Sequence, residues 1–245
     1  GIDKSDSENE PLSLTVQIAK SDSSESGGTK IKTDIKTVKC NSFNIGIAML
    51  NLENVNQINL SHCTALVISE EVAREGLGNI INTTSNNIEI RPTCNILVCQ
   101  DKAKNFLETA SKVEDISSKF YTSFIESIKI TSYTTPCTLS HFYSSTHHDI
   151  SSPLALYCFE KDDNIETLGL AIFDRYTMVG RTSGVETVCY NLLTDNFEES
   201  TIEVYNYQNP DIPLSINLSS PQKTKIKVKL EDGKPKITCN ISVNS

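Results

Sequence analysis

The segment from Leu60 to Ala110 constrains the fold more than any other part of the chain, because strand and helix signals alternate along it. His62 to Ile68 alternates and is rich in β-branched residues, which predicts a half-buried strand. Ser69, followed by two glutamates, offers a helix N-cap with negative charge in the first turn, and apolar residues recur at helical spacing through Ile81. Ile88 to Cys99 is extended again, and a second helical pattern follows it. The order predicts strand, helix, strand, helix.

Two further strands and a helix are predicted before this segment. Leu12 to Lys20 and Ile31 to Cys40 flank the polar sequence SDSSESGGT, which is typical of a hairpin tip. Ser42 then caps a helix that carries Ile45, Met49 and Leu52 on its apolar side. Glycine at position 76 falls inside a helical pattern, where it costs roughly 1 kcal/mol relative to alanine, and a close approach of helix to sheet would explain it.

The second half of the chain is predicted to be richer in strands. Ser118 starts a helix with an aromatic face, Cys137 to Ser152 is irregular, and Gly184 to Leu193 is helical among several extended segments. Together these patterns predict an α+β protein. We expect two mixed sheet-and-helix domains, residues 1–113 and 114–245, the second with a strand-rich tail.

The tail ends in a predicted hairpin, with Asp232-Gly233 between its two strands. Its apolar residues Ile226, Val228 and Leu230 pair by pattern with Ile237, Cys239 and Ile241. A two-stranded hairpin is marginal by itself, so this apolar face must pack on something. Either the hairpin joins the sheet of the second domain, which the strands between Thr201 and Leu218 favour, or it begins a third domain.

Composition excludes two classes of function. The net charge is −9 and the pI about 5.0, which argues against nucleic-acid binding, because that affinity depends on clustered Lys and Arg. A basic stripe at Lys223, Lys225, Lys227 and Lys229 is explained by one solvated face of a strand. No run approaches the roughly 18 apolar residues of a membrane span, and mean hydropathy is −0.26, so we expect this chain itself to be soluble.

The eight cysteines are predicted to be free thiols. Most of them lie in apolar or alternating runs, where cysteine behaves as a small buried hydrophobe. No CxxC motif occurs, and Cys94 and Cys99 are expected on opposite faces of one strand, which is poor geometry for a disulfide or a shared metal.

Signals for catalysis are weak. The adjacent pair His147-His148 would point apart on any regular element, so an exposed loop explains it better than a metal site. For His62, a strand histidine bonded to a backbone carbonyl is favoured over a catalytic base. A cysteine–histidine nucleophile pair stays open, because such partners are distant in sequence. No hydrolase, zinc-protease, phosphate-loop or EF-hand motif occurs, so we predict no enzyme activity, metal or cofactor.

Six colinear pieces of sequence resemble the GerAC-type, or Ger(x)C, lipoproteins, the C subunits of the nutrient germinant receptors of spore-forming bacteria. The family patterns "gH…iiiGEe", "Ar.Gi…ld" and "e.R….i.v..g.A.eiL" are similar to the segments 61–71, 73–81 and 89–107. The family patterns "giD…lTvQi", "l.GlAvFk.dklvG" and "kikv…gkpki.i.i" are similar to residues 1–18, 168–180 and 225–243. Each piece is short, and their common order is what makes the resemblance specific.

The family positions carried over have an unknown or structural role: His62, Glu70, Ala73, Gly76, Arg91, Gly169, Phe173 and Gly180. The chain departs from the family at Asn86-Asn87, where an acidic pair is usual, and in Pro136 to Pro153. The signal peptide and lipidated cysteine are missing, and the C-terminal family domain is expected to be incomplete or absent, so we interpret the chain as a core truncated at both ends.

The resemblance implies a non-enzymatic, extracytoplasmic lipoprotein subunit. It would be held by a lipid anchor on the outer face of the spore inner membrane and act with the integral membrane A and B subunits in nutrient-triggered germination. One alternative is a solute-binding lipoprotein that holds a small germinant in an interdomain cleft. A second is a hydrolase with a Cys or His nucleophile.

Overall fold

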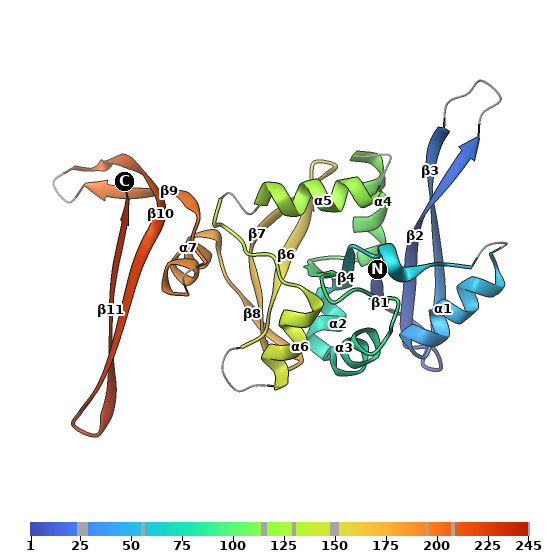
Figure 1. The fold of residues 1–245 in the computed structure, drawn as a ribbon, viewed down its shortest axis with the longest axis horizontal. Helices are drawn as coiled ribbons and strands as arrows, with labels where there is room; N and C mark the ends of the chain where they lie inside the picture. Colours follow the sequence, from blue (N-terminus) through green and yellow to red (C-terminus); the bar gives the residue numbers. More distant parts are fainter. Residues whose placement is uncertain are drawn as a thin grey trace.

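The computed structural model describes residues 1–23, 29–54, 57–113, 117–128, 131–147, 152–194, 196–206 and 209–244. Within them the larger of two sheets has eight strands in the order β3-β2-β1-β4-β5-β6-β7-β8 (Figure 1). Its strands are β1 (Ile2–Lys4), β2 (Leu12–Ser23), β3 (Thr29–Cys40), β4 (Ala65–Ser69), β5 (Asn95–Cys99), β6 (Leu154–Lys161), β7 (Asn164–Asp174) and β8 (Thr177–Arg181). The central strands β1, β4, β5 and β6 are parallel, and an antiparallel pair completes each side.

Helices cover both faces of this sheet, which is the usual arrangement around parallel strands. One face packs on α1 (Phe43–Leu52), α2 (Glu70–Glu75), α3 (Gly78–Ser85) and α6 (Leu139–His147). The other face packs on α4 (Ala103–Val113) and α5 (Ser117–Ile128). Alternate residues of β5 therefore enter different cores, Ile96 and Val98 on one side and Leu97 on the other, and all three are fully buried.

The smaller sheet lies at one end of the molecule (Figure 1). It contains β9 (Glu199–Asn206), β10 (Asn209–Glu231) and β11 (Lys234–Asn244), in the order β11-β10-β9, and α7 (Gly184–Leu193) joins it to the rest. A small core of Val188, Phe197 and Leu218 lies between α7 and this sheet. Beyond that core the β10–β11 hairpin projects away from the body.

Buried polar groups connect the two regions. Asn191 of α7 is fully buried, donates from Nδ2 to the Ser132 carbonyl at 3.0 Å and accepts from the Thr135 hydroxyl at 2.7 Å. The Ser132 hydroxyl accepts from the Glu198 amide at 3.1 Å, just before β9. The stretch from Ser132 to Thr135 thus contacts both α7 and the entry to the smaller sheet.

The structure confirms the α+β class and several elements. The Ser42 hydroxyl caps α1 by accepting from the Ile45 amide, and α7 has the predicted bounds. The Asp232-Gly233 hairpin also forms, with Ile226 opposite Cys239 and Val228 opposite Ile237. That hairpin, formed by β10 and β11, shares a sheet with β9 as expected, but this sheet is separate from the one that contains β6 to β8.

Other predictions at this level were wrong. His62 ends a single 3-10 turn (Leu60–His62) ahead of β4, and of the extended run to Cys99 only Asn95–Cys99 is a strand. The irregular region after Cys137 contains α6. In α1, Phe43, Gly46 and Leu50 are buried, whereas Ile45 and Leu52 are exposed, because the helix turns a different face to the sheet.

The predicted boundary at residue 113 lies inside the larger sheet, since β5 pairs in parallel with β6 across it. The division into residues 1–113 and 114–245 stays a prediction. Among the described residues, no helix is both long enough and apolar enough to cross a membrane.

Candidate functional site

A groove of about 1170 Å³ lies at the amino ends of β4 and β5. Its walls come from β2, from residues 57–66, from residues 91–95 and from α5. Ligands of open α/β sheets usually bind beyond the carboxyl ends of the parallel strands. This groove lies at the other ends of the strands, the amino ends.

The groove has an apolar interior and a polar rim. Leu14, Leu66 and Ile125 are buried along it, whereas His62 and Arg91 are exposed at its edge. Inside, the Tyr121 hydroxyl donates to Gln17 Oε1 at 3.5 Å, and Gln17 Nε2 donates to the Leu107 carbonyl at 3.3 Å. Two of the eight family positions, His62 and Arg91, therefore lie at one site.

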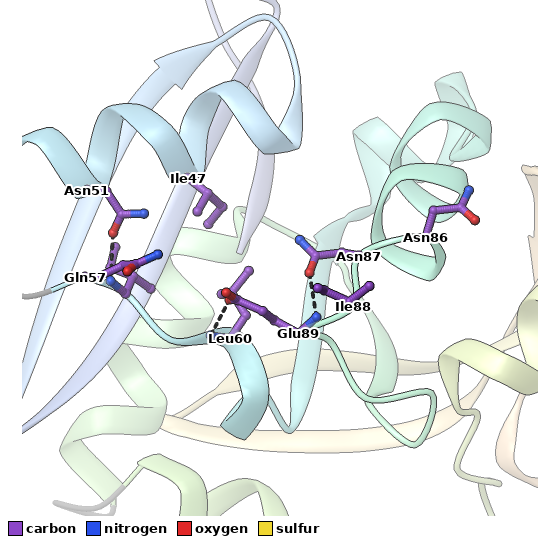
Figure 2. Close-up of a pocket in the computed structure, with 9 residues that line it drawn as sticks. Ile47, Asn51, Gln57, Leu60, Asn86, Asn87, Ile88 and Glu89 are labelled. Atoms are coloured by element: carbon purple, nitrogen blue, oxygen red, sulfur yellow. Dashed lines mark hydrogen bonds between the residues drawn. The ribbon is translucent and has the colours of Figure 1, made fainter.

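Beside this groove is a smaller hollow of about 320 Å³ lined by amides (Figure 2). Several of its polar side chains are already engaged: Asn51 Oδ1 accepts from the Ile58 amide at 2.7 Å, and Asn87 Oδ1 accepts from the Glu89 amide at 2.9 Å. Glu89 in turn accepts from the Leu60 amide at 3.3 Å. These bonds brace the loops on either side, so we interpret the hollow as structural.

Glu70 belongs to a network that the sequence did not indicate. Its Oε2 accepts from the Tyr157 hydroxyl at 2.5 Å, and Arg74 pairs with its Oε1 at 2.5 Å. Arg181 donates to the Tyr157 hydroxyl at 2.9 Å and lies 5.0 Å from the centre of that ring. The network joins α2 to the strands β6 and β8 of the larger sheet.

The electrostatics of this network favour a fixed charge over proton transfer. Burial raises the pKa of Glu70, but the hydrogen bonds from Tyr157 and Arg74 outweigh it, and the net pKa is lowered. Burial, and then the adjacent carboxylate, raise the pKa of Tyr157. Neither group titrates near neutrality, so the arrangement is suited to holding elements together.

Backbone geometry separates the three glycines among the family positions. Gly169 has φ +92°, and a Cβ there would lie 2.0 Å from the Thr182 carbonyl oxygen. Gly76 has φ +120° and ends α2, so the reason for glycine is its backbone conformation rather than the close helix–sheet approach we expected. A Cβ on Gly180 would meet nothing within 4 Å.

The remaining two family positions are core residues. Ala73 is fully buried on α2. Phe173 is 1% exposed and its ring meets that of Phe142 edge to face, with centroids 4.9 Å apart. Their role is packing.

The structure does bring one cysteine and one histidine together outside the groove. Cys137 Sγ lies 3.7 Å from His141 Nδ1. Burial raises the pKa of the Cys137 thiol to about 12, so the thiol stays protonated and is not available as a thiolate nucleophile. His147 ends α6, with Nδ1 2.8 Å from the Tyr143 carbonyl oxygen, while His148 is outside the described residues. The described part of the chain contains no group of three residues placed to hold a metal.

Comparison with known proteins identifies the fold and the family. The family profile "Spore germination protein N-terminal domain" matches residues 1–158, and "Spore germination B3/GerAC like, C-terminal" matches residues 168–245. The second match excludes the complete absence of the C-terminal family domain. Spore germination protein GerQC of Bacillus cereus is 22% identical over 223 residues, which is 89% of this chain but 61% of that protein.

A crystal structure of the GerBC protein has the same fold, with a TM-score of 0.57 at 16% identity. The match covers 99% of this chain and 70% of that one. Together with the two profile matches, it confirms the resemblance to germinant receptor C subunits. The chain belongs to the GerAC-type family of spore germination proteins.

Proposed function

We propose that this chain is the extracytoplasmic core of a germinant receptor C subunit, which acts by contact with integral membrane A and B subunits and catalyses no reaction. The observation that carries the proposal is the match of two successive family profiles, to residues 1–158 and 168–245. The family positions support it, because most of them pack, turn or brace the backbone. A lipid anchor on the outer face of the spore inner membrane is part of the same proposal.

Affinity isolation from spores tests the partners. The full-length protein, tagged at its carboxyl end, is extracted in mild detergent from the inner membrane of dormant spores and captured. We expect two multi-spanning subunits to co-purify in constant ratio, and deletion of the gene to abolish germination with one set of nutrients while spores still respond to a non-nutrient trigger. Capture without such subunits, or an unchanged nutrient response, would contradict the proposal.

A second candidate function is supported by the groove. Its volume of about 1170 Å³ and its lining of both apolar and polar side chains are sufficient to hold a small molecule. In this version Gln17 and Tyr121 would orient a germinant. The predicted place was a cleft between domains, whereas this groove lies between β2 and α5.

Thermal unfolding distinguishes the two. A ligand at 100 times its Kd stabilises the folded state by about 2.7 kcal/mol, so each nutrient that triggers the spores is added to the purified protein and Tm is measured. A rise that is lost in Gln17→Ala, but retained in the exposed rim variant Glu126→Gln, would establish the solute-binding function. A Tm that stays constant with every nutrient would contradict the solute-binding function. The proposal of action by contact with the A and B subunits would then stand by itself.

A further inference from the structure

Two thiols from distant parts of the sequence touch in the wall of the groove. Cys63 follows the 3-10 turn and precedes β4, and Cys94 directly precedes β5. The Cys94 thiol donates to Cys63 Sγ at 3.8 Å. Cys94 is 1% exposed, whereas Cys63 is half-buried, so a small molecule in the groove reaches Cys63 first.

The backbone holds these two thiols in place. The Asn95 amide donates to the Thr64 carbonyl at 3.0 Å, and Ala65 is paired with Asn95 at the start of the β4–β5 ladder. The Cys94 amide donates to the Arg91 carbonyl at 2.9 Å, and the Cys94 carbonyl accepts from Leu139 at 2.7 Å. A covalent bond would bring these two sulfurs from 3.8 Å to roughly 2.05 Å.

The other cysteines of the described structure lack this arrangement. Cys99 and Cys158 are paired in register on β5 and β6, but both are buried, and the Cys99 thiol is directed at the Asp101 carbonyl at 3.2 Å. Burial raises the pKa of both, which disfavours the thiolate. Cys189 and Cys239 are exposed, and no sulfur contact is formed by either within the described residues.

We propose that Cys63 and Cys94 are a redox-responsive pair, which a hydroperoxide in the groove converts into a disulfide that joins the amino ends of β4 and β5. This modification does not depend on the proposed receptor function. It would enclose β4, α2 and α3 in one covalent loop and replace the reactive thiol of the groove wall with a disulfide.

The chemistry balances with hydrogen peroxide as the oxidant. The Cys63 thiolate attacks one peroxide oxygen and the O–O bond breaks, which gives a Cys63 sulfenic acid and, after protonation, water. The Cys94 sulfur then attacks the sulfenic sulfur, the S–S bond forms, and the hydroxyl leaves as a second water. Two thiols are oxidised and one peroxide is reduced. The hydrogen bond from Cys94 lowers the pKa of Cys63, which makes Cys63 the attacking group.

Alkylation and mass spectrometry test the pair. Reduced protein is treated with one equivalent of hydrogen peroxide, unreacted thiols are alkylated, and peptides are mapped without reduction. We expect a crosslink between the Cys63 and Cys94 peptides, six alkylated cysteines out of eight, and a Tm raised by about 5 °C or more that dithiothreitol reverses. Crosslinks through Cys189 or Cys239 instead, or a stable sulfenic or sulfinic acid at Cys63 beside an alkylated Cys94, would overturn the proposal.

Three variants complete the test. Cys63→Ser should abolish the crosslink and the peroxide-dependent rise in Tm, while Cys94→Ser should leave a sulfenic acid at Cys63 that dimedone labels. The double variant Cys189→Ser/Cys239→Ser removes two exposed thiols and should form the crosslink at the wild-type rate. A loss of the crosslink in this double variant would show that the exposed cysteines carry the reaction.

Discussion

The two sheets of this protein are built from the same kinds of strand but are covered very differently. β5 lies between two helical layers, and Ile96, Leu97 and Val98 are fully buried. In the β10–β11 hairpin, Val228 is 65% exposed and Ile237 62% exposed, although they face each other across the ladder. An apolar pattern therefore indicates which face of a strand can be buried. Whether that face is buried depends on the helices that pack against it.

The hairpin has a second, opposite face that sharpens the contrast. Lys225, Lys227 and Lys229 alternate with the apolar residues along β10, and Lys236 of β11 lies opposite Lys229. One face is thus basic and the other apolar, and the apolar side chains of Ile226, Val228 and Leu230 are more than half exposed.

Amide exchange should give the largest difference between the two regions. Amides of Ile96 to Cys99 open only with global unfolding, whereas those of Lys225 to Leu230 open when one hairpin separates. We expect protection factors about 1000-fold higher in β5 than in the hairpin, measured by hydrogen–deuterium exchange with mass spectrometry. Equal protection would mean that the hairpin is covered in solution, and the comparison would fail.

Adding one methyl group at Gly169 should destabilise the larger sheet. Gly169→Ala places a Cβ 2.0 Å from the Thr182 carbonyl oxygen at a φ of +92°, and strain and overpacking together should cost about 3 kcal/mol of unfolding free energy. The matched control Gly180→Ala lies on the neighbouring strand in open space, and we expect a change below about 0.5 kcal/mol. Urea unfolding measures both, and similar costs would contradict the geometry.

A charged side chain should stabilise the larger sheet through the Tyr157–Glu70 hydrogen bond, whereas the ion pair of the β10–β11 hairpin should contribute little. Tyr157→Phe removes the hydrogen bond to Glu70 and should cost about 1–2 kcal/mol at pH 7. The pKa of Glu70 is lowered in the folded state, so its contribution is present above the pKa of an unfolded glutamate and is lost as pH falls through the folded value. Urea unfolding at pH 7 and at progressively lower pH should therefore show the cost of Tyr157→Phe shrinking.

The control for charge lies on the hairpin. Lys236 pairs with Glu231 at 2.7 Å, but both side chains are more than half exposed. Lys236→Ala should change the unfolding free energy by less than about 0.5 kcal/mol at any of these pH values. A constant cost for Tyr157→Phe, or a large cost for Lys236→Ala, would remove the distinction.

The smallest effect is expected on the apolar face of the hairpin. Val228→Ala should change stability by less than about 0.5 kcal/mol, because the side chain is 65% exposed. Leu218 lies on the same strand but is 8% exposed against α7, so Leu218→Ala should cost about 2–3 kcal/mol. A cost at Val228 close to that at Leu218 would show that the apolar face is buried in the purified protein.

Helix ends that are fixed by neighbouring residues could be predicted from the sequence. The bounds of α7 were predicted correctly, and its start is fixed locally, because Ser183 and Glu186 form a capping box within the first turn of the helix. The cap of α4 could not be predicted in this way. Asp3 accepts from the Ala103 amide at 2.7 Å and the Lys104 amide at 3.0 Å, and nothing near Ala103 indicates a partner so distant in sequence.

The same limit applies to the sites. Apolar residues from Val72 to Ile81 keep helical spacing across Gly76, so the sequence predicted one helix where the backbone turns and the Leu77 amide bonds to the Tyr176 carbonyl. Gly169 and Gly180 are both family positions, yet only the fold distinguishes the required glycine from the one with free space. The contact of Cys63 with Cys94 likewise depends on the pairing of β4 with β5.

The three residues of β1 have a consequence for the order of folding. β1 pairs with β2 on one side and with β4 on the other, and it is the strand that joins these two within the larger sheet. Ile2 is synthesised well before its partner Ile68. The β2–β3 hairpin and the β4–β8 unit can each form from shorter-range pairings, while their union waits for a non-local step, which is the slow kind. We therefore expect β1 to be the last strand to take its place in the larger sheet.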